Sequence, residues 1–175
     1  MTYSPDFPGW AVIDIDGVLA DVRHRLVHVE RSPKNWDAFF AAAPLDPPLA
    51  RGIEVVHEQL AAGRRVAYVS GRPERCRADT VAWLEAQGLA STPLHLRGDA
   101  DRRPARLTKL ELVRMLERSA PIDVVVDDDI AVVTAMRAAG YEVLHATWMD
   151  GGTEGVDHSP AQDALFEAQE VEGRT

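Results

Sequence analysis

The residues in this sequence that are best suited to chemistry are acidic, and the first of them end an apolar run. The run begins at Trp10 and leads into Asp14-Ile15-Asp16-Gly17, so two carboxylates stand one residue apart. Alternate residues of a strand share a face, and Gly17 lets the chain turn away, so we expect Asp14 and Asp16 to lie close together. Such a pair is accounted for if a divalent cation neutralises it, or if one carboxyl group holds a proton while the other stays ionised. The alternative is an ordinary polar turn after a strand.

Three further groups complete a candidate site for phosphoryl transfer. They are Ser70-Gly71-Arg72, Asp127-Asp128-Asp129 and Lys109. Carboxylates at this density indicate Mg²⁺, which leaves room for water and for phosphate oxygens of a substrate. Ser70 and the amides around Gly71 can bind an oxyanion at the start of the following helix, and Lys109 can neutralise another oxygen. A carboxylate can serve as the nucleophile, but the residues alone leave open which member of the first pair attacks.

The elements that must position these groups alternate between strands and helices. Near-continuous apolar strands separated by amphipathic helices predict a doubly wound α/β fold, with a parallel sheet covered on both faces. In such a sheet, ligands bind outside the carboxyl ends of the strands, which is where all three acidic or hydroxyl groups fall. After the first strand, the predicted strands are Arg65–Ser70, Leu94–Leu96, Ile122–Val126 and Tyr141–His145, and the predicted helices are Leu49–Ala62, Glu74–Gln87, Leu107–Glu117 and Ile130–Ala139.

Residues 20–48 form an irregular excursion from this pattern. Trp36, Phe39 and Phe40 are spaced as one short amphipathic helix, and the prolines from Pro44 to Pro48 close the segment. The segment is too short to be an independent cap domain. We expect either a flap over the strand ends or a packed connection.

Composition indicates one ordinary globular domain. The chain has 175 residues with a net charge of −9, of which residues 146–175 carry −6 through seven acidic residues and one basic residue. We therefore predict a domain over residues 1–149 and an acidic, partly disordered tail over 150–175, in which Ala161–Ala168 could form a small helix. No apolar run is long enough to span a membrane and no leader pattern is present, so we expect a cytoplasmic protein without a membrane partner. The single cysteine, Cys76, excludes an internal disulfide.

Four motifs, in this order, resemble those of the haloacid dehalogenase superfamily of phosphatases. They are Asp14-Ile15-Asp16-Gly17-Val18-Leu19, Val69-Ser70-Gly71-Arg72-Pro73, Lys109 within a helix, and Val126-Asp127-Asp128. Within that superfamily, further segments are similar to the phosphatase domain of bacteriophage-type polynucleotide kinase/phosphatase: His24-Arg25, Asn35-Trp36-Asp37, Trp83-Leu84, Arg97-Gly98-Asp99 and Val132-Val133. The resemblance covers about Trp10 to Met149 and implies a HAD-like fold that has no cap or a minimal flap.

The resemblance also implies a role for each matching residue. Asp14 would attack phosphorus and become an aspartyl-phosphate, and Asp16 would protonate the leaving alkoxide and then deprotonate water. The metal ligands of a bound Mg²⁺ would be Asp14, Asp16 through its main-chain carbonyl, and Asp127 or Asp128. Phosphate would be bound by Ser70, Gly71 and Lys109, and the rest of the substrate by Arg25 and Arg72. The implied reaction is the removal of a 3′-phosphate from nucleic-acid ends or nucleotides.

Two departures from the polynucleotide phosphatases keep a second substrate class open. An aspartate usually stands four residues before the motif lysine, where this chain has Ala105, and an arginine commonly follows the paired aspartates, where it has Asp129. Together with the acidic charge balance, Ala105 favours the alternative of a nucleoside-monophosphate or small-metabolite phosphatase. No Gly-Lys-Ser/Thr of a phosphate-binding loop is present, so we expect any kinase, or a ligase, to be a separate partner polypeptide.

Two other classes of protein could present similar residues. A phospho-acceptor signalling domain also combines acids, a hydroxyl residue and a lysine, but there the acceptor aspartate ends a middle strand, where this chain has Ser70. A non-catalytic phosphate-binding module is the other alternative, and the presence of Asp14, Asp16, Ser70 and Lys109 together disfavours it. The arginines from Arg97 to Arg106 could form either a solvated loop or a substrate contact.

Overall fold

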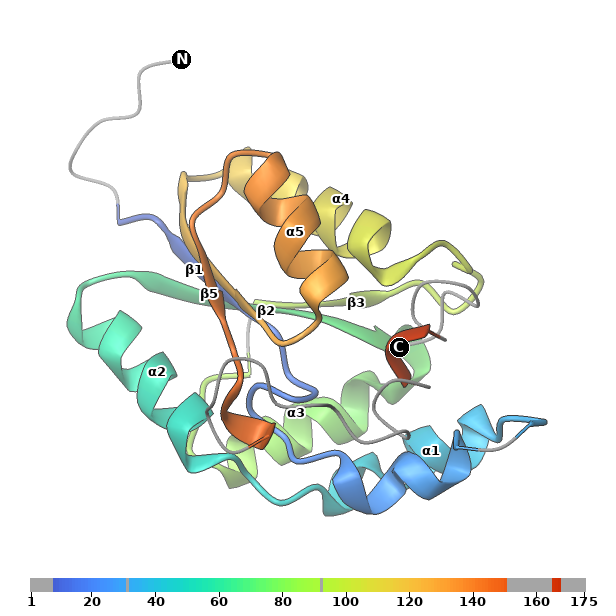
Figure 1. Ribbon diagram of the computed structural model, residues 1–175. Helices are drawn as coiled ribbons and strands as arrows, with labels where there is room; N and C mark the ends of the chain where they lie inside the picture. Colours follow the sequence, from blue (N-terminus) through green and yellow to red (C-terminus); the bar gives the residue numbers. More distant parts are fainter. Residues whose placement is uncertain (1–7, 31, 92, 151–164, 168–175) are drawn as a thin grey trace.

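The central feature of the fold is a sheet of five parallel strands (Figure 1). The computed structural model describes residues 8–30, 32–91, 93–150 and 165–167. Across the sheet the strands follow the order β3-β2-β1-β4-β5, and they are β1 Trp10–Ile13, β2 Arg65–Pro73, β3 Leu94–Arg97, β4 Ile122–Asp127 and β5 Val143–His145. All four pairings are parallel, so the carboxyl ends of the strands lie at one edge. The doubly wound parallel sheet expected from the sequence is confirmed.

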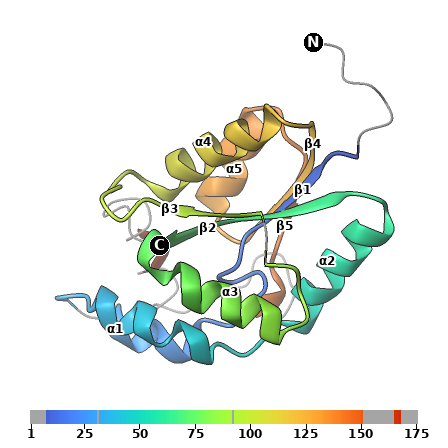
Figure 2. The same ribbon diagram turned by 180° about the vertical axis from the view of Figure 1, so that it is seen from behind.

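Helices cover both faces of this sheet. The helices α2 Ala50–Ala61 and α3 Arg77–Ala86 lie on one side, and α4 Ala105–Glu117 and α5 Ile130–Ala138 lie on the other (Figures 1 and 2). Each face has its own buried apolar cluster, the first with side chains of α2 and α3 and the second with side chains of α4 and α5. None of the described helices has both the length and the apolar character needed to cross a membrane.

Strand β1 lies at the centre because its side chains are apolar on both faces. Ala11 and Ile13 join the cluster beneath α2 and α3, whereas Trp10 and Val12 join the cluster beneath α4 and α5. This division follows from the alternation of side chains along a strand. A strand that is buried on both sides is a rigid support for whatever follows its carboxyl end.

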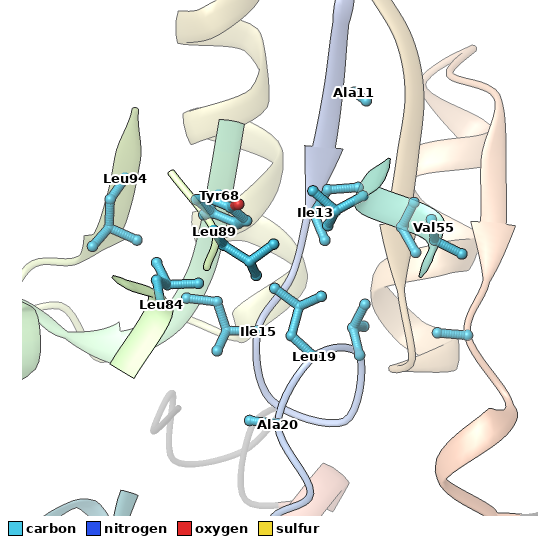
Figure 3. Close-up of a cluster of buried hydrophobic side chains, with 14 of the residues drawn as sticks. Ala11, Ile13, Ile15, Leu19, Ala20, Val55, Tyr68, Leu84, Leu89 and Leu94 are labelled. Carbon is cyan, nitrogen blue, oxygen red and sulfur yellow. The ribbon is translucent and has the colours of Figure 1, made fainter. Parts of the chain in front are cut away.

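The loop after β1 is anchored by the first of these clusters. Ile15 and Leu19 are fully buried and continue the row begun by Ala11 and Ile13, with Leu84 of α3 beside Ile15 (Figure 3). The carbonyl of Ile15 also accepts the amides of Leu19 and Ala20, at 2.8 and 2.9 Å. Apolar anchors on either side of Asp16 therefore fix the backbone that carries the first acidic pair.

Element boundaries differ from the sequence prediction at two places near the strand ends. Strand β2 does not end at Ser70 but continues to Pro73, with an irregular register against β3 between these two residues. A 3-10 turn over Glu74–Cys76 then precedes α3, so the helix that was expected from Glu74 begins at Arg77. A bulge of this kind redirects the strand without ending its pairing, and the apolar pattern alone does not reveal it.

Among residues 20–30 and 32–48, the structure has three short helices, η1 Arg23–His28, α1 Trp36–Ala41 and η2 Ala43–Leu45. The helix predicted from the aromatic spacing is confirmed as α1, which Asn35 caps by accepting the amide of Ala38 at 3.0 Å. In both views α1 lies on the α3 side of the sheet, away from α4 and α5. Of the predicted tail over 150–175 and its possible helix at Ala161–Ala168, all but residues 150 and 165–167 lie outside the described residues.

Candidate active site

Three aspartates from two neighbouring strands meet at the carboxyl edge of the sheet. Asp14 follows β1, Asp127 ends β4, and Asp128 comes next in the chain. Strands β1 and β4 are paired in parallel, with Ile13 opposite Val126, so their ends bring these side chains together. One carboxylate oxygen from each residue lies within 4.8 Å of the others. We call Asp14, Asp127 and Asp128 the acidic trio.

Lys109 of α4 reaches into the acidic trio. Its Nζ donates hydrogen bonds to Oδ2 of Asp14 and to Oδ2 of Asp127, both at 2.8 Å. Lys109, Asp14 and Asp127 are each buried. One cation therefore faces three carboxylates, which leaves an excess of two negative charges in a buried place if all four groups are ionised.

Gly17 makes room for Asp128. The φ of Gly17 is +75°, and a Cβ built there would lie 1.9 Å from Oδ2 of Asp128. Any other residue would meet both a strained backbone and a steric clash with the carboxylate. Because Gly17 has no Cβ, the carboxylate of Asp128 can lie against the loop that carries Asp14 and Asp16.

The acidic trio holds protons more tightly than ordinary carboxylates do. Burial, together with the charge of Asp127, raises the pKa of Asp14 to about 7 in spite of Lys109. Burial raises the pKa of Asp127 as well, and burial with the charges of Asp127 and Asp14 places the pKa of Asp128 well above its usual value. The pKa of Lys109 is raised by the same carboxylates, against the effect of its burial, so the lysine stays charged.

These properties fit a divalent cation. The donor set is all oxygen, Oδ1 of Asp14 is buried without a hydrogen-bond partner among the described residues, and the excess charge is −2. Mg²⁺ is bound in proteins by a few carboxylates and completes its shell with water or phosphate oxygens. The cation would take the place of the protons that the raised pKa values otherwise retain.

Asp16 points into a second cluster, which is rich in arginine. Its Oδ1 accepts hydrogen bonds from Nη2 of Arg25 at 2.8 Å, and from Nε and Nη2 of Arg72 at 2.9 and 2.6 Å. Burial would raise the pKa of Asp16, but the charges of the two guanidinium groups outweigh it and hold the pKa below its usual value. The side chain of Asp16 is therefore not one of the three carboxylates of the acidic trio, although the sequence placed it beside Asp14.

Asp46, which the sequence analysis did not single out, closes this second cluster. Its fully buried carboxylate accepts hydrogen bonds from Nε and Nη2 of Arg25, both at 2.8 Å, and from Nη2 of Arg72 at 2.9 Å. We call Asp16, Arg25, Asp46 and Arg72 the arginine box. The sequence does contain one clue to its role. Asp46 is an acidic residue within the proline-rich run from Pro44 to Pro48, and a connection that only packs against the core would not require an acid there.

Ser70 and Gly71 lie on β2, the strand next to β1. Tyr68 pairs with Ile13, so Ser70 lies two residues further, beside the loop that carries Asp14 and Asp16. Ser70 is buried, and its Oγ accepts the amide of Arg72 at 3.3 Å. Within the described part of the chain no hydrogen bond joins Ser70 or Gly71 to the acidic trio, so their place beside the site rests on strand register.

The arginine-rich loop after β3 is largely occupied with its own contacts. Arg97 is buried. Its Nη1 donates a hydrogen bond to the carbonyl of Arg103 at 2.7 Å, and its Nε donates to the carbonyl of Gly71 at 3.3 Å. Arg103 pairs with Asp101 at 2.7 Å and with Glu111 at 2.5 Å. These contacts give Arg97 and Arg103 a structural role: they support the loop and the backbone of Gly71.

The solved structures that this chain resembles support the fold. It matches a chain of the Pnkp1/Rnl/Hen1 RNA repair complex with a TM-score of 0.68 and 21% identity, over 83% of this chain and 44% of that one. It matches the class C acid phosphatase of Bacillus anthracis with tungstate bound, with a TM-score of 0.60 and 14% identity, over 93% and 80%. A haloacid dehalogenase-like protein of Streptococcus pneumoniae matches with a TM-score of 0.57 and 10% identity, over 91% and 98%.

Family membership comes from the sequence itself. The chain spans less than half of the Pnkp1 complex chain that it matches, and no curated protein matches it. The family model described as the phosphatase domain of polynucleotide kinase PNKP matches residues 8–150. This match covers most of the chain, including every residue of the acidic trio and the arginine box. The protein therefore belongs to the PNKP phosphatase-domain family of the haloacid dehalogenase superfamily.

Proposed function

We propose that this protein is a Mg²⁺-dependent phosphomonoesterase that forms an aspartyl-phosphate and removes 3′-phosphates from nucleic-acid ends or nucleotides. The observation that carries the proposal is the pairing of Asp14 with Lys109 inside the acidic trio. A buried carboxylate beside a cation site is poised to attack a phosphate, because the cation and Lys109 together offset the repulsion between the two anions.

In this proposal Asp14 is the nucleophile. A carboxylate oxygen of Asp14 attacks phosphorus, the bond from phosphorus to the leaving oxygen breaks, and Asp16 donates a proton to that oxygen, so that an alcohol leaves. Asp16 then takes a proton from water, the resulting hydroxide attacks the aspartyl-phosphate, and inorganic phosphate leaves from Asp14. Mg²⁺ held by Asp14, the carbonyl of Asp16, and Asp127 or Asp128 would neutralise charge on the transferring group.

The arrangement of charge around Asp16 affects its part in the first step. Without substrate the two arginines keep Asp16 ionised, so it must gain a proton before it can act as an acid. The negative charge of a phosphate dianion that enters the site raises the pKa of the neighbouring carboxyl group. Ser70, Gly71 and Lys109 would bind the phosphoryl oxygens in this state.

The substrate class rests on the family and on the shape of the chain. The described residues contain no inserted cap domain, only the short helices of residues 20–48, which is compatible with a large substrate such as a nucleic-acid end. The Pnkp1 structure is a complex with Rnl and Hen1, and we propose that a ligase or kinase polypeptide is a partner here as well.

One observation favours a mononucleotide or small ester as a second candidate substrate. Ala105, at the position where an aspartate is usual, is fully buried at the start of α4, so it offers nothing to a substrate. Arg97 and Arg103 are also engaged within the protein. Fewer groups near the loop after β3 are therefore available to hold a nucleic-acid strand beyond its terminal nucleotide.

Phosphate release with Mg²⁺ and with a chelator tests the proposal. The substrates are a 3′-phosphorylated oligonucleotide, the same oligonucleotide with a 5′-phosphate, a panel of mononucleotides and simple phosphate esters. We expect release that depends on Mg²⁺ and is fastest from the 3′-phosphorylated end. Faster release from mononucleotides or simple esters would replace the substrate class and keep the chemistry, whereas no Mg²⁺-dependent release from any of them would contradict the proposed function.

A further inference from the structure

Asp46 is a buried acid next to the proposed chemistry, and the reaction as proposed gives it no part. It follows η2, and its side chain is fully buried. Its backbone is also held, because Nε1 of Trp83 on α3 donates to the carbonyl of Asp46 at 2.8 Å. A carboxylate fixed by both its backbone and its side chain has a defined position, and the side chains of Arg25 and Arg72 link that position to Asp16.

Each arginine of the box is shared between the two aspartates. Nη2 of Arg25 lies 2.8 Å from Oδ1 of Asp16 and 2.8 Å from Oδ2 of Asp46, and Nη2 of Arg72 lies 2.6 Å and 2.9 Å from the same two oxygens. Two cations and two anions thus balance, which reduces the cost of burying four charges. Without the Asp46 carboxylate, both guanidinium groups would lose an acceptor and Asp16 alone would face both of them.

The two oxygens of Asp16 are left in different environments by this arrangement. Oδ1 receives three N–H groups from the arginines, whereas Oδ2 is buried and has no hydrogen-bond partner among the described residues. A proton placed on Oδ1 would compete with these three donors. Oδ2 is the oxygen that can carry and deliver a proton.

We propose that Asp46 is a positioning residue for proton transfer: it holds Arg25 and Arg72 against Oδ1 of Asp16, so that Oδ2 is kept free to exchange the proton with the leaving group. This inference rests on the proposed function, since it assigns an atom to the acid step of that reaction. Asp46 itself touches neither the acidic trio nor Lys109 in the described contacts.

The experiment compares two substrates that differ in their need for an acid. An alkyl phosphate has a poor leaving group that must be protonated, whereas an aryl phosphate such as p-nitrophenyl phosphate has a leaving group that departs as an anion. For Asp46→Asn, we expect kcat/KM for the alkyl phosphate to fall about 100-fold and kcat/KM for the aryl phosphate to fall far less, because general acid catalysis is worth at least that much. A purely structural role would lower both values by the same factor.

A control and a second variant keep the test decisive. Asp79→Asn, an exposed change on the neighbouring α3, should leave both substrates unaffected. If Asp46→Asn does not fold, as judged by thermal unfolding, His24→Ala serves instead. The ring nitrogen Nε2 of His24 lies 2.7 Å from Oδ1 of Asp46, and the side chain is partly exposed, so its removal disturbs Asp46 without emptying the box. We expect a smaller loss, again confined to the alkyl phosphate.

The outcomes separate this inference from the proposed function. An equal loss on both substrates, or no loss on the alkyl phosphate, would overturn the role of Asp46 while wild-type activity upheld the phosphatase. A wild type that releases phosphate from neither substrate would contradict the proposed function, and the role of Asp46 with it.

Discussion

The acidic trio and the arginine box share one loop, yet they solve the problem of buried charge in opposite ways. In the trio, three carboxylates face one lysine, and the pKa values of all three carboxyl groups are raised. In the box, two carboxylates face two arginines, and the arginines lower the pKa of Asp16, whereas burial raises the pKa of Asp46. The trio therefore carries an excess of negative charge that a cation from outside would offset, whereas the formal charges of the box balance. Only Ile15 separates Asp14, which pairs with Lys109, from Asp16, which pairs with Arg25 and Arg72.

The largest expected effect comes from changing the proposed nucleophile. Asp14→Asn should lower kcat for phosphate release by at least about 1,000-fold, since an amide cannot form the acyl-phosphate. The variant should remain folded in the absence of Mg²⁺, because it removes one of the repelling charges of the trio. Phosphate release with the preferred substrate, together with thermal unfolding, checks both parts. Hydrolysis at the wild-type rate would sink the covalent mechanism.

The second prediction concerns stability and separates the two clusters. Arg72→Met leaves Asp16 and Asp46 with one arginine in a buried place, so we expect the free energy of unfolding to fall by about 3–5 kcal/mol, with no recovery when Mg²⁺ is added. Lys109→Met leaves the trio without its cation, so its loss of stability should be recovered in part by Mg²⁺. Urea unfolding with and without Mg²⁺ measures these differences.

The matched control for the arginine change is Arg77→Met. Arg77 pairs with Glu74 on the surface of the same region, and exposed ion pairs contribute less than about 1 kcal/mol. If Arg72→Met cost no more than Arg77→Met, the balance of charge in the arginine box would not contribute to stability as expected.

Gly17 gives a smaller effect that is confined to the trio. Gly17→Ala places a residue with a Cβ at φ +75° and against Oδ2 of Asp128. We expect a loss of about 1–3 kcal/mol in stability and weaker binding of Mg²⁺. Gly63→Ala is the control, since Gly63 has φ +79° with no atom within 4 Å of the added Cβ, so it reports the backbone cost alone. Equal Mg²⁺ affinity in the two variants would show that Asp128 is not part of the cation site.

The smallest expected effect is a pH dependence of the stabilisation by Mg²⁺. Asp14 has a raised pKa of about 7, so without a cation its contribution to stability is present below about pH 3.8 and is lost as the pH rises through 7. Mg²⁺ must displace that proton at low pH. The increase in Tm on adding Mg²⁺ should therefore be larger at pH 8 than at pH 5.5. Below pH 7, the free energy of Mg²⁺ binding should weaken by about 1.4 kcal/mol per pH unit for each proton displaced. An increase that does not change with pH would argue against a site built on Asp14.

Sequence reasoning could locate the acidic trio because strand ends in a parallel sheet meet at one edge. The positions of Asp14, Asp127 and Lys109 follow from the apolar runs and the helix spacing, and the structure places these side chains in contact. Alternation also predicts that Asp16 shares a face with Asp14, but it does not reveal that the side chain of Asp16 pairs with Arg25 and Arg72.

The role of Asp46 could not be predicted from the sequence for a different reason. Its partners Arg25 and Arg72 are 21 and 26 residues away, and the contact depends on how the connection after η2 packs against α3. Packing of this kind leaves no periodic pattern of apolar residues in the sequence. The extension of β2 to Pro73 was missed likewise, because a bulge changes register without changing the apolar pattern. What local spacing encodes was predictable, whereas what long-range packing encodes was not.

Calorimetric titration of Mg²⁺ into the wild type, Asp127→Asn and Arg72→Met tests the contrast between the two clusters most directly. The account predicts one Mg²⁺ site in the wild type, its loss in Asp127→Asn, and its retention in Arg72→Met as long as that variant is folded. No binding to the wild type, or equal binding to the wild type and Asp127→Asn, would contradict a cation site at the acidic trio.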